Sequence, residues 1–270
     1  MNKGIAISFI ISTYNWPEAL ELSLHSISHQ TILPSEIIIA DDGSDKRTET
    51  VIQKFASQTS IPVFHMWHED NGFRKAIILN KAIQKTRYDY IIQIDGDIIV
   101  DKHFIEDHLN AMEEGCFIRG TRANLSTSMS TDILAKKKIS FNHKIKLIAK
   151  QMPNALRLPL SIASLCTRKE QSGKKVKGCN MSFWRKDLLA VNGYNSLLQG
   201  WGHEDEELSW RLVNNGISKK IIKFSAIAYH IYHKQLPRTQ EPSHCIILQR
   251  IIQEKTTWTN EGITSKITPL

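Results

Sequence analysis

The sequence predicts an α/β fold in which helices flank a mostly parallel central sheet. Two observations predict it: strand-like and helix-like periods alternate over the first hundred residues, and polar clusters follow three of the apolar runs. A length of 270 residues suits one large domain with a modest extension, and 41% hydrophobic residues supply a sizeable core. No internal repeat or clear linker divides the chain.

Strands and helices are expected to alternate in the first hundred residues. Continuous apolar and β-branched runs predict buried strands at 6–12, 36–40, 63–67 and 90–94. After the first strand, Pro17 occupies a favoured first helical position, and Leu20, Leu24 and Ile27 recur at helical spacing. A second helix is expected up to about residue 57 and a third at 74–86.

The second half of the chain is less regular. The periodicity weakens from 124 to 177, apart from a basic helix expected at 139–152. The apolar face of this helix is expected to consist of Phe141, Ile145, Ile148 and Met152. The later elements expected are an ordered segment at 178–184, an acidic helix at 204–215, a strand at 221–230 and an amphipathic stretch within 242–270.

The N-terminus predicts a buried strand rather than a signal peptide. Its short apolar run continues into polar residues without a small-residue cleavage site. No run approaches the ~20 apolar residues that span a bilayer, so we expect a cytoplasmic protein. The four cysteines are widely spaced and form no C-x-x-C pair, which argues against a zinc knuckle and predicts reduced thiols.

The net charge of +8 comes from one segment. Residues 133–169 hold nine Lys/Arg and no acid, which leaves about −1 for the rest of the chain. The segment is a solvated insertion, a helix on an anionic membrane surface, or a nucleic-acid-binding patch. No aromatic residue alternates with the lysines, so nucleic acid is not expected. We favour the membrane surface over the solvated insertion.

Three polar clusters are expected to meet at one edge of the sheet, because parallel strands place their carboxyl ends together and ligands bind there. Ser12-Thr13-Tyr14, Asp41-Asp42-Gly43-Ser44 and Asp95-Gly96-Asp97 each follow an expected strand. The Asp95 and Asp97 carboxylates suit a divalent ion held against phosphate oxygens, with a solvated turn as the alternative. Asp41 and Asp42 suit hydrogen bonds from a nucleobase or ribose, and the same segment also suits a turn capped by Ser44 or Asp45.

Residues 200–207 (GWGHEDEE) are the most informative segment. Trp201 lies between two glycines and offers a flat apolar face to a sugar ring. Glu204 and Asp205 begin a helix, whose dipole stabilises anions, and a carboxylate there suits a general base. A merely acidic helix start is the alternative, but it would not require the glycines.

Two further segments carry candidate residues. His230 and His233 are three residues apart after an expected strand, which suits ligation of the same ion as Asp97. Arg74, within Asn71-Gly72-Phe73-Arg74-Lys75, opens a helix whose free N–H groups and basic side chains suit a phosphate. A capped, solvated first turn is an equal alternative for the second segment.

Taken in order, these motifs resemble family 2 glycosyltransferases of the GT-A fold, a Rossmann-like fold that binds nucleotide sugars. The matching segments are 12–15, 41–44, 71–74, 95–97 and Gly178-Cys179-Asn180-Met181-Ser182. Residues 200–207 with the two histidines resemble a C-terminal motif shared by β-1,4-galactosyltransferases and chondroitin-polymerase domains. The resemblance covers about 6–234 apart from the basic segment.

The resemblance implies a role for each matching residue. The donor site would comprise Thr13, Tyr14, Asp41, Asp42, Arg74 and Asp95. Asp97 and His233 would bind Mn²⁺ or Mg²⁺, and His230 occupies the place of a methionine ligand in the galactosyltransferases. Trp201 and Glu204 would bind the acceptor, and Asp205 would be the catalytic base.

The resemblance also implies an activity: transfer of a sugar, with inversion, from a UDP-sugar to a hydroxyl of a glycan or lipid-linked glycan. The setting would be the synthesis of a surface polysaccharide or lipopolysaccharide at the inner face of the cytoplasmic membrane. A sugar-phosphate nucleotidyltransferase is one alternative, but the first strand is not followed by the Gly-rich loop it requires. A non-catalytic nucleotide- or glycan-binding protein is the other, and it would not need a positioned base.

One GT-A domain at 1–238 and a helical extension at 239–270 form the expected organisation. Within the domain, 1–123 would be the nucleotide-binding half, 124–177 the basic insertion and 178–238 the acceptor-binding half.

Overall fold

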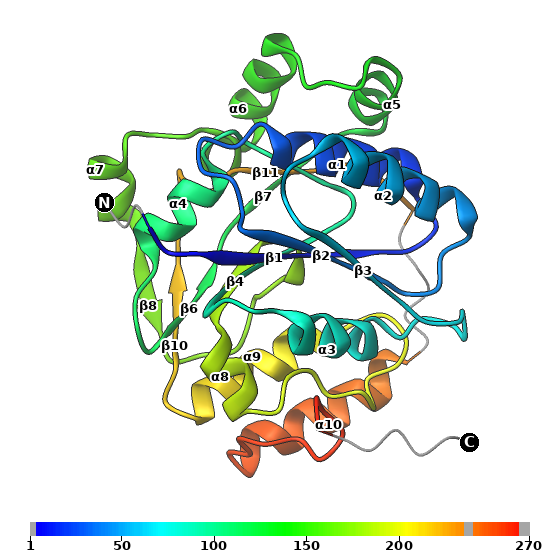
Figure 1. The fold of residues 1–270 in the computed structure, drawn as a ribbon. Coiled ribbons are helices and arrows are strands. Elements are labelled where there is room, and N and C mark those ends of the chain that lie inside the picture. The colour runs from blue at the N-terminus through cyan, green and yellow to red at the C-terminus, as the bar shows by residue number, and fades with distance from the viewer. Residues whose placement is uncertain (1–3, 235–239, 265–270) are drawn as a thin grey trace.

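A mixed sheet of eight strands forms the centre of the molecule (Figure 1). The computed structural model describes residues 4–234 and 240–264, so the expected boundary at 238/239 lies outside the described residues. The strands, in the order in which they lie side by side, are β3 (Val63–Trp67), β2 (Glu36–Asp41), β1 (Ile7–Thr13), β4 (Tyr90–Asp95), β9 (Met181–Trp184), β6 (Cys116–Arg119), β10 (Ser218–Ile221) and β8 (Arg168–Glu170).

The first four of these strands are parallel and confirm the expected strands of the N-terminal half. The sheet as a whole is mixed, because β9 runs antiparallel to both β4 and β6, and β8 runs antiparallel to β10. A second, three-stranded sheet has the order β5 (Ile98–Val100), β11 (Ala228–His230), β7 (Arg122–Asn124). The expected mostly parallel arrangement therefore holds for β3, β2, β1 and β4, whereas among the other described strands of the large sheet only the pair β6 and β10 is parallel.

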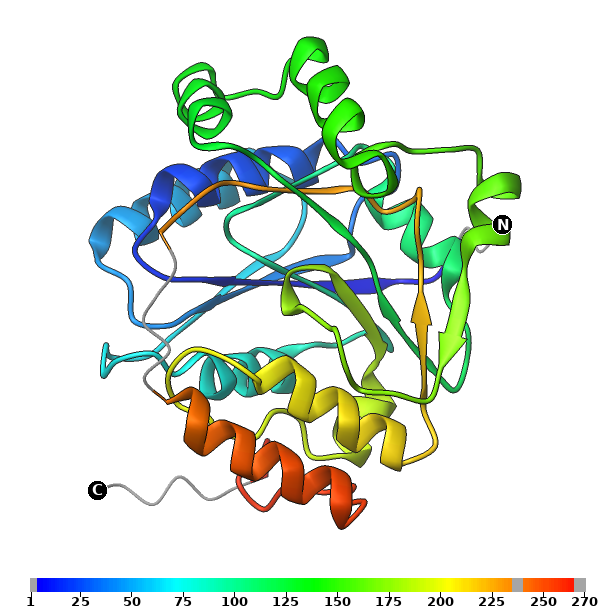
Figure 2. The same ribbon diagram turned by 180° about the vertical axis from the view of Figure 1, so that it is seen from behind.

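Helices cover both faces of the large sheet, as the two opposite views show (Figures 1 and 2). One core packs α1 (Pro17–Ser28), α2 (Lys46–Gln58) and α4 (Phe104–Ala111) on one face. The other core packs α3 (Lys75–Lys85), α8 (Arg185–Ala190) and α9 (Glu204–Asn214) on the opposite face. Alternate residues of β1 serve the two cores, with Phe9 in the first and Ile10 in the second, as the two-residue period of a strand requires.

The single strand expected at 221–230 is wrong. The chain forms β10 and β11 there, which belong to different sheets. Between them, Phe224 and Ala226 adopt left-handed backbone conformations with φ of 56° and 46°. A strand cannot continue through such residues, so the apolar run is split although its hydrophobicity is continuous.

The basic segment forms three helices: α5 (Thr127–Lys136), α6 (Phe141–Ala155) and α7 (Leu160–Ala163). In Figure 1, α5 and α6 lie above the small sheet and α7 lies at the left, beside α4. The apolar face expected for α6 is wrong in part, because Ile145 and Met152 are about half exposed while Leu147 is buried. The side chain of Phe141 lies outside what the structure describes. Gln151 departs from helical geometry, with φ of −141° and ψ of 44°, and its side chain accepts from the Asn124 N–H and donates to the Asn124 carbonyl of β7. The helical spacing assumed over 139–152 is therefore broken before Met152.

The C-terminal amphipathic stretch forms α10 (Glu241–Gln253), which packs against α9. Within the described ranges, no helix is both long and apolar enough to cross a bilayer. All four cysteines are free thiols, as expected, with Cys116 and Cys179 buried.

Candidate active site

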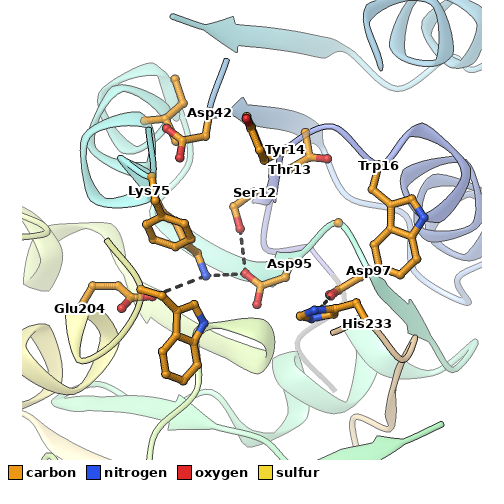
Figure 3. A pocket seen from close by; sticks show the side chains of 14 residues that line it. Ser12, Thr13, Tyr14, Trp16, Asp42, Lys75, Asp95, Asp97, Glu204 and His233 are labelled. Carbon is orange, nitrogen blue, oxygen red and sulfur yellow. Dashed lines mark hydrogen bonds and ion pairs between the residues drawn. The ribbon is translucent and has the colours of Figure 1, made fainter. Parts of the chain in front are cut away.

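A pocket opens at the carboxyl ends of β1 and β4 (Figure 3). All three polar clusters expected at this edge contribute to it, and segments near both α3 and α9 complete it. Its lining residues are Ser12, Thr13, Tyr14, Trp16, Asp42, Phe73, Lys75, Ile78, Asp95, Gly96, Asp97, Trp201, Glu204 and His233. The prediction that the strand ends form one site is therefore confirmed in its geometry.

Backbone contacts hold the polar clusters together. The Gly96 N–H donates to the Ser12 carbonyl at 2.7 Å, and the Asp42 N–H donates to the Thr13 carbonyl at 3.0 Å. A Cβ at Gly96 would lie 3.0 Å from the Thr13 hydroxyl, so glycine allows the Asp95-Gly96-Asp97 turn to approach β1 closely. The carboxylates of Asp95 and Asp97 are thereby fixed on either side of this contact.

Asp97 meets both candidate histidines. Its Oδ2 lies 3.3 Å from Nε2 of His230 and 3.2 Å from Nε2 of His233. One ligand atom from each of the three side chains lies within 4.8 Å of the others, a spacing that suits a shared metal ion. Among the described residues the Asp97 Oδ1 is buried without a hydrogen-bond partner, so it is an oxygen that a cation would satisfy.

Lys75 is the only lysine among the described residues that line the pocket. Its Nζ donates to Asp95 Oδ1 at 2.6 Å and lies 4.0 Å from Glu204 Oε1 (Figure 3). Although burial opposes it, the neighbouring carboxylates, Asp95 foremost, keep the pKa of Lys75 well above its usual value. The ammonium is therefore a fixed positive charge between the Asp95 turn and the start of α9.

Asp42 is held from two directions. Its Oδ1 lies 2.7 Å from His68 Nε2, and its Oδ2 accepts the Arg74 N–H at 2.8 Å. Asp41, in contrast, does not line the pocket, because its buried carboxylate binds the Ser44 N–H and His65. Of the two caps that the sequence suggested for α2, the structure uses Asp45, whose side chain accepts the Arg47 N–H.

Arg74 also lies outside the pocket lining. Its guanidinium donates to the Glu69 carbonyl, so the contact that it makes toward the site comes from its backbone. Tyr14 does reach the pocket, where its hydroxyl donates to Asp70 at 2.9 Å and has its pKa raised chiefly by that hydrogen bond. The donor-site residues predicted from sequence thus divide into those that line the pocket and those that support it.

Glu204 and Asp205 begin α9 as expected, but they face different surroundings. Glu204 lines the pocket, and burial together with Asp205 raises its pKa to about 7. Asp205 lies behind it, where its Oδ2 accepts the Gly178 N–H at 2.6 Å and its Oδ1 lies 3.4 Å from the Tyr194 hydroxyl. Burial raises the pKa of Asp205 as well.

The sequence indicated Trp201 and missed several residues of the site. Trp201 lines the pocket between Gly200 and Gly202, both of which have positive φ. Phe73, Trp16 and Tyr194 were not predicted, and Lys75 was noted only as a basic neighbour of Arg74. The sequence carries no separate signal for Lys75, because its place in the site follows only from the start of α3 at this residue and from the hydrogen bond of the preceding Arg74 N–H to Asp42.

The arrangement of acids and histidines at the strand ends, beside a helix start that carries two carboxylates, is that of a GT-A-fold glycosyltransferase. Solved structures agree with this class. TarS of S. aureus (residues 1–349) matches with a TM-score of 0.62 at 15% identity, over 93% of this chain and 65% of that chain. The mannosyltransferase PcManGT of Pyrobaculum calidifontis, in complex with GDP-Man and Mn²⁺, matches with a TM-score of 0.59 at 15% identity, over 92% of this chain and 64% of that one. At this identity the likeness shows the fold.

The chain belongs to glycosyl transferase family 2, whose sequence profile matches residues 8–159. Residues 159–234 match a second profile, described as the N-terminal domain of galactosyltransferase. Curated relatives include the chondroitin synthases of Escherichia coli, 24% identical over 83% of this chain, and of Pasteurella multocida (strain Pm70), 25% identical over 85%. The matches span 34% and 25% of the length of these two relatives. The family resemblance drawn from the motifs is confirmed.

Proposed function

We propose that this glycosyltransferase is metal-dependent and inverting, and that it transfers a sugar from a UDP-sugar to a hydroxyl of a glycan acceptor in the synthesis of a surface polysaccharide or lipopolysaccharide. The observation that carries the proposal is the convergence of Asp97, His230 and His233 on one side of a pocket that has Glu204 on the other. A metal site facing a buried carboxylate provides both the group that neutralises a leaving diphosphate and a group that binds or activates a hydroxyl.

The residues present fit a divalent ion. The unpaired Asp97 Oδ1 and two imidazole nitrogens offer a mixed oxygen and nitrogen donor set. This set favours Mn²⁺ over Mg²⁺, since Mg²⁺ prefers oxygen ligands alone. The Nδ1 atom of His233 lies 3.0 Å from the Lys234 carbonyl, an interaction that fixes Nε2 as the coordinating atom. A bound ion would neutralise charge on the diphosphate as the sugar leaves.

The other residues of the pocket fit a nucleotide sugar. Tyr14, Thr13 and Asp42 would bind the nucleoside, with the Asp42 carboxylate accepting hydrogen bonds from the base or ribose. The charged Lys75 ammonium, fixed against Asp95, would lie near the donor phosphates and sugar. Uridine is favoured by likeness: a structure of TarS is a complex with UDP, and chondroitin synthases are among the relatives of this chain.

The proposed reaction is a single in-line displacement. The acceptor oxygen attacks the anomeric carbon, the bond from this carbon to the diphosphate oxygen breaks, and the hydroxyl proton passes to a carboxylate. Asp205 would be this base, with Glu204 and Trp201 binding the acceptor. An α-linked donor would give a β-linked product. Glu204 is a second candidate for the base, because its carboxylate and not that of Asp205 lines the pocket.

Thermal unfolding with a panel of nucleotides tests the proposal. UDP or one UDP-sugar should raise the unfolding temperature of the wild type when Mn²⁺ is present, because a ligand that binds only the folded state stabilises it. The Asp97→Ala variant should lose this shift and retain its unfolding temperature without ligand. A shift that is equally large without metal, or in Asp97→Ala, would contradict the metal site. Stabilisation by GDP or by dTDP alone would contradict the choice of UDP.

A further inference from the structure

A second cavity lies beside the small sheet and is lined by five cations: Arg119, Arg122, Arg168, Lys177 and Lys223. We call it the basic pocket. Among the described residues that line it there is no carboxylate. Its remaining lining is mostly polar and includes Thr121, Asn124 and Asn180. A hollow with this composition suits a ligand that is small, polar and negatively charged.

The positive charge of the basic pocket is only partly neutralised by the protein. Arg168 pairs with Glu170 at 3.0 Å. Burial lowers the pKa of Arg119, and burial together with Arg122 lowers the pKa of Lys177, so these cations are held in a setting that disfavours their charge. An anion in the cavity would remove this penalty.

Two polar atoms of the basic pocket have no partner. The Arg122 Nε and the Thr121 Oγ1 are buried without a hydrogen bond, and Thr121 is only 6% exposed. Within the described ranges, the Arg122 guanidinium makes a weak hydrogen bond from Nη1 to the Cys179 sulfur at 3.5 Å. Buried N–H and O–H groups are normally satisfied, so these unpaired groups indicate a ligand that accepts hydrogen bonds.

The basic pocket and the active site share a short turn. In the 3₁₀ turn Gly178–Asn180, the Gly178 N–H binds the Asp205 carboxylate, while Cys179 and Asn180 line the basic pocket. Consecutive Cα atoms are about 3.8 Å apart, so the proposed base and this cavity are neighbours. The pairing of β7 with β11 also brings the basic pocket close to the active site. Asn124, which lines the basic pocket, lies in register with the candidate metal ligand His230.

We propose that the basic pocket binds an oxyanion, a carboxylate or phosphate, carried by the glycan acceptor, and thereby directs an acceptor hydroxyl toward the base. This inference rests on the proposed glycosyl transfer. The planar guanidinium groups of Arg119 and Arg122 suit both oxyanions, which they bind through paired N–H donors. The donor diphosphate would have its own counter-charges in Lys75 and in the cation that Asp97, His230 and His233 would hold, so the basic pocket is left for the other substrate.

The test measures binding of four small probes to the acceptor side of the site. Methyl β-glucuronide and methyl β-glucoside have the same sugar ring and differ in one carboxylate. Glucose 6-phosphate tests a phosphate on a sugar, and inorganic phosphate tests a free anion. Binding to the protein with Mn²⁺ and UDP is followed by ligand-observed NMR. The wild type should bind each of the two anionic sugars at least about 10-fold more tightly than the glucoside. This factor corresponds to one charge-assisted hydrogen bond, which contributes about 1.5 kcal/mol.

A double variant, Lys177→Gln with Lys223→Gln, removes two of the five cations of the basic pocket and should reduce this preference while it keeps its affinity for UDP. The matched control, Lys102→Gln with Lys255→Gln, removes two exposed lysines from other parts of the surface and should keep the preference. Equal wild-type binding of glucuronide and glucoside would overturn the inference, as would weaker UDP binding in the double variant. Binding of inorganic phosphate but neither anionic sugar would also overturn it, because the site would then serve a free anion.

Hydrolysis of UDP-sugars, in which water replaces the acceptor hydroxyl and UDP is released, provides the separate readout of the proposed function. If no donor is turned over while the charge preference is present, the proposed transfer fails and the basic pocket remains an anion site. If donors are turned over and the preference is absent, this inference alone fails.

Discussion

Glu204 and Asp205 are adjacent carboxylates with different surroundings, and their roles can be separated. Asp205 is held by the Gly178 N–H and the Tyr194 hydroxyl, whereas Glu204 faces the pocket and Lys75. Removing a general base typically slows a reaction by 10²–10⁴-fold, whereas removing a binding group weakens the substrate complex. The two substitutions should therefore affect different kinetic constants.

We expect Asp205→Asn to lower kcat by about 10²-fold or more while UDP affinity stays unchanged. Glu204→Gln should mainly raise the acceptor KM. Steady-state kinetics with varied acceptor, together with UDP titration, measure both. Circular dichroism of each variant checks that the fold is kept. If Glu204→Gln abolishes kcat and Asp205→Asn retains turnover, the base is Glu204.

The pKa of Glu204 predicts a pH dependence of stability. Its value of about 7 in the folded protein exceeds the ordinary value of 4.5, so the folded state retains a proton that the unfolded chain releases between these values. The contribution of Glu204 to the free energy of unfolding therefore falls as the pH rises from 4.5 to 7. Above pH 7 the buried charge destabilises the fold by its full amount, and below 4.5 this cost is absent.

Glu204→Gln should thus be more stable than the wild type at pH 8, by about 1–3 kcal/mol, and similar to it near pH 4.5. Urea unfolding at both pH values, with a chelator present, measures the difference. Glu206→Gln, on the same turn but outside the pocket lining, is the control and should show no such trend. A stability difference that does not change with pH would mean that Glu204 titrates normally.

Single residues also show where sequence reasoning ends. Asp97 and the two histidines could be proposed as ligands from their residue types and spacing, and they do converge. Lys75 could not be assigned in this way, because its partners Asp95 and Glu204 are 20 and 129 positions away along the chain. The same holds for Asp41: its sequence context matches Asp42, but the alternation of a strand turns its carboxylate toward His65 and away from the pocket.

Among the elements, α9 determines where both carboxylates lie. A fully buried ion pair fixes it: the Arg211 guanidinium bonds both oxygens of Glu207 and also donates to the carbonyls of Val191 and Gly193. These bonds connect the helix to the loop after α8. The N-terminus of α9, with Glu204 and Asp205, is therefore positioned by an interaction one to two turns further along the helix.

Arg211→Met should destabilise the protein by about 3–5 kcal/mol, because it leaves the Glu207 carboxylate buried without its partner. Chemical denaturation measures this value. Arg250→Met, which removes an exposed pair with Glu254 on α10, should cost less than about 1 kcal/mol and serves as the control. An equal effect of both substitutions would show that the buried pair does not hold α9.

The elements differ in how well the sequence predicts them. β1 to β4 could be predicted because each is a run of five or more residues in which apolar character and a following polar turn agree. β5, β7 and β11 could not be predicted, because a strand of three residues is too short to show an alternating pattern. Their positions are determined by their pairing in the second sheet. Helix α6 was predicted, but which side it buries depends on the bonds between Gln151 and Asn124.

For the molecule as a whole, the basic segment is less unusual in the structure than in the sequence. Six of its nine cations form ion pairs with acids outside the segment: Lys136, Lys137, Lys144, Arg157, Arg168 and Lys169. Of the other three, Lys146 and Lys150 are exposed on α6, near the exposed Ile145 and Met152, and Lys138 is exposed just before this helix. The surface that fits an anionic membrane is therefore limited to this part of α6 and to Lys138, and α6 packs on the small sheet.

We expect weak, salt-sensitive binding to anionic vesicles. Each lysine near such a surface contributes about 1 kcal/mol, so Lys146→Gln with Lys150→Gln should remove most of the binding, as should Ile145→Ser with Met152→Ser. Flotation with phosphatidylglycerol-rich vesicles, compared with neutral phosphatidylcholine vesicles, measures it, and Lys102→Gln with Lys255→Gln is the charge-matched control. No flotation at moderate salt would identify the segment as a solvated insertion. Binding would instead place the small sheet, with His230 and the basic pocket, close to the lipid surface. An acceptor that carries an anionic group next to its lipid would then lie within reach of both pockets.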